Sequence, residues 1–226
     1  MGNRIGRRQG SQLDIFMTLA STPPSRREER RDERRDAILD VARDCFLTDG
    51  YAATSMSAIA ARLGGSKGTL YNYFRSKEEL FAAVMERQCA HLQEVMFDVS
   101  ILGEAPRERL THYARSFLDL LLSPMAMTLH RLVVSESERF PELGRTFYEA
   151  GPRVVMARIA AYLAELMDQG ALRRADPLVA AQHFKDLAIS GLYQPRLWGI
   201  IGDPTPQARD VQVDRAVDTF MRAYAP

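Results

Sequence analysis

Apolar residues recur at helical spacing along most of the chain. In the stretch EERRDERRDAILDVARDCFLTDG, residues 28–50, one stripe carries Ile38, Leu39, Ala42, Cys45 and Phe46, and Gly50 follows as a helix terminator. Three further segments repeat this period, at 54–63, 66–73 and from 76 onward. Prolines that suit a first helical position mark later helices at 106, 124, 141, 177 and 206. With no alternating strand beside a hairpin turn, the pattern predicts an all-α fold of about nine helices.

Two of the predicted helices lie close together in TSMSAIAARLGGSKGTLYNYFRSK, residues 54–77. They are three or four residues apart and joined through glycine, which is the spacing of a helix-turn-helix. Ala60 is small enough for the second helix to cross nearby, and Gly64 can adopt the positive φ of a sharp turn. The sequence therefore predicts a helix-turn-helix motif at 55–74.

The second of these helices has two different sides. At 100° per residue, Leu70 and Phe74 fall together and should join Ile59 and Leu63 in a small core. The remaining sides carry groups suited to base edges or phosphates, so we predict DNA contacts there. With the flanking helix starts, the predicted DNA-binding set is Thr54, Ser55, Ser66, Lys67, Gly68, Thr69, Tyr71, Asn72, Tyr73 and Lys77. Thr54 and Lys77 are expected to clamp the DNA backbone on either side.

This stretch resembles the signature of the TetR family of transcriptional regulators. The matching positions are Thr54 or Ser55, Ile59, Ala60, Gly64, Ser66, Gly68, Tyr71, Tyr73, Phe74, Lys77 and Leu80. The resemblance implies an N-terminal three-helix DNA-binding domain, a C-terminal helical ligand-binding and dimerisation domain, and a homodimer that an unknown small-molecule effector releases from double-stranded operator DNA. Contact of Tyr73 with a phosphate, and repression rather than activation, rest on the family alone. Gly65 departs from the family pattern, where an apolar residue is usual; this should loosen the turn slightly, unless a neighbour fills the gap.

The predicted organisation has three parts. Residues 1–27 are expected to form a disordered basic arm, 32–92 the DNA-binding domain and 100–226 the ligand-binding and dimerisation domain; the natural start could be Met1 or Met17. Charge is unevenly spread. Residues 1–77 hold 14 Lys and Arg against 9 Asp and Glu, or +5, whereas the rest holds 16 against 20, or −4. A basic end on an otherwise acidic chain favours a polyanionic partner at that end.

Two later segments, 152–169 and 177–198, are broadly apolar and contain small residues. The resemblance to the TetR family implies that this pair forms a four-helix bundle with its copies in a second chain, although both could be ordinary core helices of a monomer. The predicted dimer-interface residues are Val155, Ile159, Leu163, Leu166, Phe184, Leu187 and Leu192.

Large adaptable or aromatic side chains gather in the same region. They favour a pocket for a small apolar or aromatic ligand, although such residues are more often plain core. The predicted pocket residues are Met127, His130, Phe147, Tyr148, Met156, Phe184 and Trp198.

The alternatives are a small all-helical enzyme and a helical protein-interaction module without DNA binding. No catalytic residue can be assigned, because HExxH is absent and no GxSxG, P-loop or GxGxxG pattern follows a strand. We expect no metal and no cofactor. Cys45 and Cys89 are expected to be buried thiols. The absence of a long apolar run and of a signal peptide favours a cytoplasmic protein without membrane contact.

Overall fold

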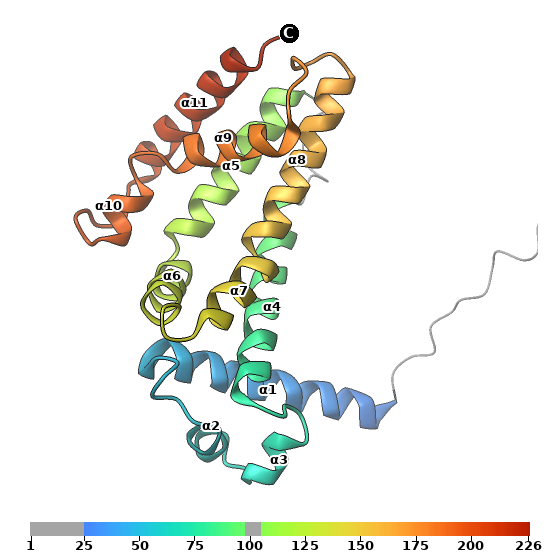
Figure 1. Cartoon of the computed structure of the whole chain (residues 1–226), viewed down its shortest axis with the longest axis vertical. Coiled ribbons are helices and arrows are strands. Elements are labelled where there is room, and N and C mark those ends of the chain that lie inside the picture. Colours follow the sequence, from blue (N-terminus) through green and yellow to red (C-terminus); the bar gives the residue numbers. More distant parts are fainter. Residues whose placement is uncertain (1–24, 98–104) are drawn as a thin grey trace, which may run out of the picture.

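A computed structural model describes residues 25–97 and 105–226 of the chain, apart from the side chains at positions 91, 92 and 95. The described residues form eleven helices and no strand, which confirms the all-α fold (Figure 1). The helices are α1 (Arg26–Asp49), α2 (Met56–Arg62), α3 (Lys67–Tyr71), α4 (Lys77–Met96), α5 (Pro106–Leu122), α6 (Pro124–Glu136), α7 (Pro141–Ala150), α8 (Pro152–Asp168), α9 (Pro177–Ile189), α10 (Tyr193–Leu197) and α11 (Pro206–Ala223).

The helix starts follow the chemistry of the sequence. Serine hydroxyls at positions 25, 55, 66 and 76 accept a backbone N–H at the starts of α1, α2, α3 and α4. A proline occupies the first turn of α5, α6, α7, α8, α9 and α11, where a missing N–H costs no hydrogen bond. These local signals explain why most of the predicted helix starts are confirmed.

Two predicted boundaries are wrong. The segment 177–198 is not one helix, because the chain turns between α9 and α10, where Gly191 has a φ of +78°. The predicted arm 1–27 ends in helix: Ser25 and Glu28 form a capping box that starts α1 at Arg26. Residues 1–24 of that arm, and 100–104 of the predicted C-terminal domain, lie outside the described residues.

Two hydrophobic cores hold the helices together. The first core, which joins α1, α2, α3 and the start of α4 with α6 and α7, includes the whole predicted stripe Ile38, Leu39, Ala42, Cys45 and Phe46. The second core joins α5, α8, α9 and α11. Helix α4 enters both, through Leu80, Phe81, Val84 and Met85 in the first core and Met96 in the second. In Figure 1, α4 rises from the lower group of helices, where α1, α2 and α3 lie, into the upper group.

No single helix in the described part of the chain is long and apolar enough to cross a membrane. Helices α5 and α6 pass that test only as a pair bent by 66°.

Candidate nucleic-acid interface and ligand cavity

The α2–α3 turn has the geometry of a helix-turn-helix. Gly64 adopts a φ of +67°, and the N–H groups of Gly64 and Gly65 donate to the carbonyls of Ala61 and Ala60. A Cβ at position 65 would lie 3.1 Å from the guanidinium of Arg34 on α1. Because that position faces a cation instead of the core, Gly65 leaves room for Arg34.

Helix α3 divides into a buried side and an open side. Leu70 and Phe74 are buried in the first core, as predicted. Lys67, Gly68 and Asn72 are exposed, and the Tyr71 side chain is 41% exposed. The Lys67 ammonium lies 5.7 Å from the centre of the Tyr71 ring, close enough for a cation–π contact. This open side therefore presents a cation, an aromatic ring and an amide to solvent.

The remaining polar side chains of α3 lie nearer its edges. Thr69 and Tyr73 are half-buried. The Ser66 and Ser55 hydroxyls are exposed, but each accepts a backbone N–H at 3.1 Å, from Thr69 and Ala58 respectively. Their first role is to begin α3 and α2, so any contact with DNA would be additional.

The buried position of Thr54 contradicts its predicted role as a DNA clamp, and the half-buried Lys77 has partners within the protein. Thr54 is 2% exposed, and its hydroxyl donates to the carbonyls of Gly50 at 2.7 Å and Cys45 at 3.2 Å. The Lys77 ammonium donates to the carbonyls of Tyr51 and Thr54 at 2.9 and 3.1 Å, and it lies 4.2 Å from the centre of the Tyr51 ring. Both side chains point inward because the segment 51–54 packs against the start of α4.

The sequence reasoning missed Tyr51, whose ring is buried against Phe46, Phe81 and Phe140. Its hydroxyl donates to Glu78, and burial is the main cause that raises the pKa of Tyr51 well above its ordinary value. The aromatic residue directly after the Gly50 terminator was the available signal. Tyr51 and Lys77 together attach the loop before α2 to α4.

A cavity of about 250 Å³ is lined by residues of α4, α5, α6, α7, α8, α9 and α10. Three of the predicted pocket residues line it, namely His130, Phe147 and Met156. The other four do not. Met127 and Phe184 are buried in the second core, whereas Tyr148 is 55% exposed and Trp198 is 67% exposed. Residue type alone does not reveal which side of a helix faces a cavity.

The walls of the cavity are mostly apolar and include Phe117, Leu121, Leu129, Val155 and Ile189.

The few polar groups of the cavity are neutral or already paired. The Nδ1 atom of His130 lies 2.7 Å from the Tyr193 hydroxyl, and burial lowers the pKa of His130 and raises the pKa of Tyr193. The Gln93 amide donates to the carbonyl of Ala150 at 2.9 Å. Cys45 and Cys89 are buried free thiols, as predicted, and burial raises the pKa of Cys89, which lines the cavity, to about 11. The site suits a largely apolar guest with few hydrogen-bonding groups.

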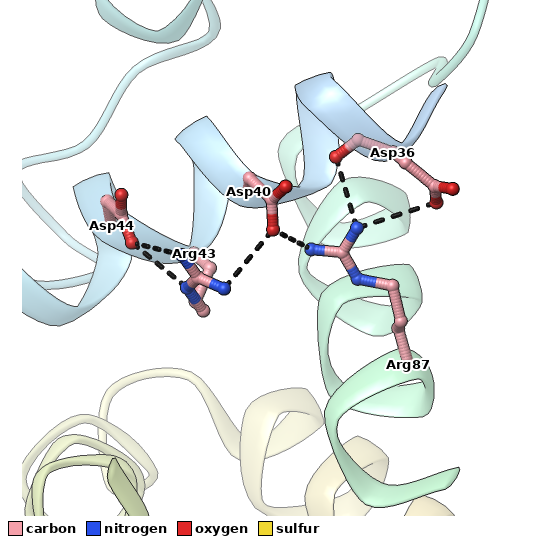
Figure 2. A network of polar contacts seen from close by, with 5 residues as sticks. All are labelled: Asp36, Asp40, Arg43, Asp44 and Arg87. Carbon is pink, nitrogen blue, oxygen red and sulfur yellow. Dashed lines mark hydrogen bonds and ion pairs between the residues drawn. The ribbon is translucent and has the colours of Figure 1, made fainter. Parts of the chain in front are cut away.

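The part of α4 that lines the cavity lies next to a residue that binds α1. Gln88 and Cys89 line the cavity, and the preceding residue, Arg87, reaches the other way. Its guanidinium donates to the carbonyl of Asp36 at 3.1 Å and to the carboxylate of Asp40 at 2.6 Å (Figure 2). Arg43 on α1 also binds Asp40 and Asp44, but it stays within its own helix. Arg87 thus connects the cavity wall to the first helix.

The predicted dimer residues belong mainly to the interior, which is a second correction. Five of them are buried in the second core of the same chain, namely Val155, Ile159, Leu163, Leu166 and Phe184. Leu187 and Leu192 are half-buried and pack against that core. On broadly apolar helices, the strongest apolar repeat marks the side that faces the chain's own core.

The described residues contain no cluster of three or more His, Cys, Asp or Glu side chains that could hold a metal ion.

Two family models match the chain. The model of the AefR-like transcriptional repressor C-terminal domain matches residues 108–226, and the model of the tetR family of bacterial regulatory proteins matches residues 38–84. Among curated relatives, the transcriptional repressor AcnR of Corynebacterium diphtheriae is 33% identical over 78 residues. That match spans 34% of this chain and only 40% of the relative.

Solved structures match over more of the chain. The flavonoid-responsive regulator FrrA is 34% identical, with a TM-score of 0.75, over 86% of this chain and 98% of that one. A TetR-family regulator from Mesorhizobium loti is 26% identical, with a TM-score of 0.78, over 87% and 99% of the two chains.

The inward position of Thr54 leads to a stability prediction. Replacing Thr54 with Val removes a buried hydroxyl and leaves two carbonyls without that donor, so the free energy of unfolding should fall by about 1 to 2 kcal/mol. Urea unfolding measures this, with Thr128→Val as the matched control, because the Thr128 hydroxyl donates to the carbonyl of Pro124 outside the core. An unchanged stability with strongly weakened DNA binding would restore Thr54 as a DNA contact.

Proposed function

Because the chain belongs to the TetR family of transcriptional regulators, we propose that it is a ligand-responsive repressor. A dimer binds a palindromic operator through α3, and a small apolar or aromatic molecule in the cavity releases it. The observation that carries the proposal is the open side of α3, which lies beside a buried side that fixes its position. Repression is supported by the description of the C-terminal family model and by the repressor AcnR.

The open side of α3 suits a major groove. Gly68 permits close approach of the backbone, Tyr71 offers an apolar ring and a hydroxyl, and Asn72 can pair with a base edge. Lys67 stands at the helix start, where its charge favours a phosphate. Thr69 and Tyr73, at the edges of the same helix, can reach the backbone of the duplex.

Replacing Tyr71 with Ala should weaken operator binding by about 5- to 150-fold, since a specific contact contributes about 1 to 3 kcal/mol. Lys67→Ala should weaken binding to all duplexes more evenly, because a phosphate contact carries no sequence information. Tyr148→Ala is the matched control, as Tyr148 is also an exposed tyrosine but lies on α7. Fluorescence anisotropy with a selected operator measures all three, and normal binding by Tyr71→Ala would contradict the assignment.

A dimer would present two copies of α3 to half-sites separated by about 34 Å or a multiple of it. We place the interface on the outward faces of α8 and α9, which pack against each other. Helix α9 leaves Leu178 and Val179 exposed, and α8 leaves Ala157 and Ala161 exposed. Exposed apolar side chains next to small residues allow close helix packing between two copies.

Val179→Glu should therefore convert the dimer into a monomer of 25.5 kDa, because it places a charge on the proposed interface. Light scattering after size exclusion measures the mass. Val134→Glu is the matched control: Val134 is 73% exposed, on α6, away from that face. A dimer that survives Val179→Glu and dissociates with Val134→Glu would place the interface elsewhere.

The effector proposal rests on the apolar cavity and the His130–Tyr193 pair. FrrA responds to flavonoids, which are planar aromatic molecules with hydroxyl groups, so flavonoids and other planar aromatic compounds form the first panel to screen. The link to DNA binding would be α4, because a guest that presses on Gln88, Cys89 or Gln93 also displaces Arg87 and with it α1.

Arg87→Gln should reduce the coupling between cavity and DNA by about 2- to 30-fold, which corresponds to 0.5 to 2 kcal/mol. The measurement is the ratio of operator affinities without and with a compound selected from the panel by thermal shift. Arg43→Gln is the control, because Arg43 binds the same Asp40 without reaching α4. Equal coupling in wild type and Arg87→Gln would show that the signal takes another route.

A further inference from the structure

The first turns of α1 carry charges in an unusual order. From Arg26 to Asp36, every pair of charged residues four positions apart has the same sign. At 100° per residue, this order places the arginines within roughly half of the helix circumference and the acids in the other half. The basic face, as we name it, consists of Arg26, Arg27, Arg30, Arg31, Arg34 and Arg35.

The basic face is turned toward α3. Arg35 lies 5.4 Å from the ring centre of Phe74, and Arg34 lies beside Gly65 in the turn before α3. Further toward the N-terminus, a groove runs between the two helices; Arg27, Glu28, Arg30 and Arg31 line one side of it, and Thr69, Asn72 and Tyr73 line the other. In Figure 1, the N-terminal half of α1 extends to the right beyond α4, and α3 lies below α1.

The opposite face of α1 serves the protein's own fold. Its Asp36 and Asp40 bind Arg87 of α4. Within the described ranges, by contrast, no carboxylate lies within 4.0 Å of the six guanidinium groups of the basic face. Glu28 accepts hydrogen bonds from the N–H and hydroxyl of Ser25, which lower its pKa. The groove therefore holds three positive charges against one negative charge.

This arrangement weakens the isolated helix, because like charges four apart repel each other by about 0.2 to 0.5 kcal/mol a pair. An external anion would relieve that repulsion. An arginine guanidinium can donate two parallel hydrogen bonds to the oxygens of one phosphate. The hydroxyls of Thr69 and Tyr73 across the groove are further donors. The groove opens beside the proposed DNA-reading side of α3, so the anion that fits its position is the backbone of the same duplex.

We propose that the basic face of α1 is a second DNA-binding element, whose Arg27, Arg30 and Arg31 hold backbone phosphates flanking the half-site that α3 reads. This inference rests on the proposed DNA-binding function and extends it to a segment that precedes the family-model match, which begins at residue 38. Because phosphates carry no base identity, this element contributes affinity and salt dependence, and α3 contributes sequence choice.

The test is the triple variant R27Q/R30Q/R31Q in the full-length chain, since glutamine keeps a high helix propensity. Three lost phosphate contacts should reduce the slope of log affinity against log salt by about 2 to 3 for each protomer. Operator affinity should fall by about 10- to 100-fold at about 0.15 M salt, and the preference for operator over scrambled duplex should stay unchanged. In an ethylation-interference assay, ethylation of the phosphates that flank each half-site should no longer impair DNA binding by this variant.

Two matched variants control for charge and fold. E29Q/D32Q/E33Q changes three charges on the opposite face of the same helix and should cause no loss of affinity. R27K/R30K/R31K keeps the charges and should retain most of the salt slope, although lysine lacks the paired donors of arginine. Circular dichroism checks that all three variants remain helical.

An unchanged salt slope and unchanged phosphate interference in R27Q/R30Q/R31Q, with Tyr71→Ala still impaired, would overturn this inference and leave the proposed function intact. Equal losses in the acidic-face variant would also overturn it, because the effect would then belong to helix stability. Failure of the wild-type chain to bind any duplex selected from a random pool would instead refute the proposed function.

Discussion

The arrangement of the whole chain depends on the packing of α4 in two hydrophobic cores at once. Its first half is buried with α1, α2 and α3, and Met96 near its end is buried with α5, α8, α9 and α11. Protein cores are close-packed, so a helix shared by two of them cannot shift in one without rearranging the other. The cavity lies between these two anchor regions, with Gln88, Cys89 and Gln93 in its wall. A guest there meets a helix that takes part in both cores.

Polar contacts decide how firmly the α2–α3 pair follows α4. Lys77 fixes the start of α4 to the loop before α2 through the carbonyls of Tyr51 and Thr54, and the Thr54 hydroxyl fixes that loop to the end of α1. Arg87 adds a third attachment, from the middle of α4 to Asp36 and Asp40. Because Lys77 lies over the buried ring of Tyr51 and Arg87 reaches an earlier part of α1, the N-terminal helices are held to α4 at several points.

The features that depend on local chemistry could be predicted from the sequence. The apolar stripe from Ile38 to Phe46, the buried Leu70 and Phe74 and the serine caps all follow from periodicity and hydrogen bonding within a few residues. The predictions from the sequence were wrong where the direction of a side chain depends on segments far away in the chain. Lys77 looks like a surface cation until the loop before α2 encloses its ammonium, and Phe184 looks like a pocket residue until α11 covers it. For the same reason, Val155 to Leu166 marked the core and not the dimer face.

The acidic and basic faces of helix α1 connect it to two different partners. Its acidic face is attached to α4 through Arg87, and its basic face lies along the groove beside α3. If phosphates occupy that groove, α1 is the element through which a movement of α4 would reach the DNA backbone and the reading helix together. Segregated charges then have two physical roles: attraction to an internal arginine on one side and to an external polyanion on the other. A helix with the same charges mixed around its circumference would neutralise itself within its own turns and could serve neither role.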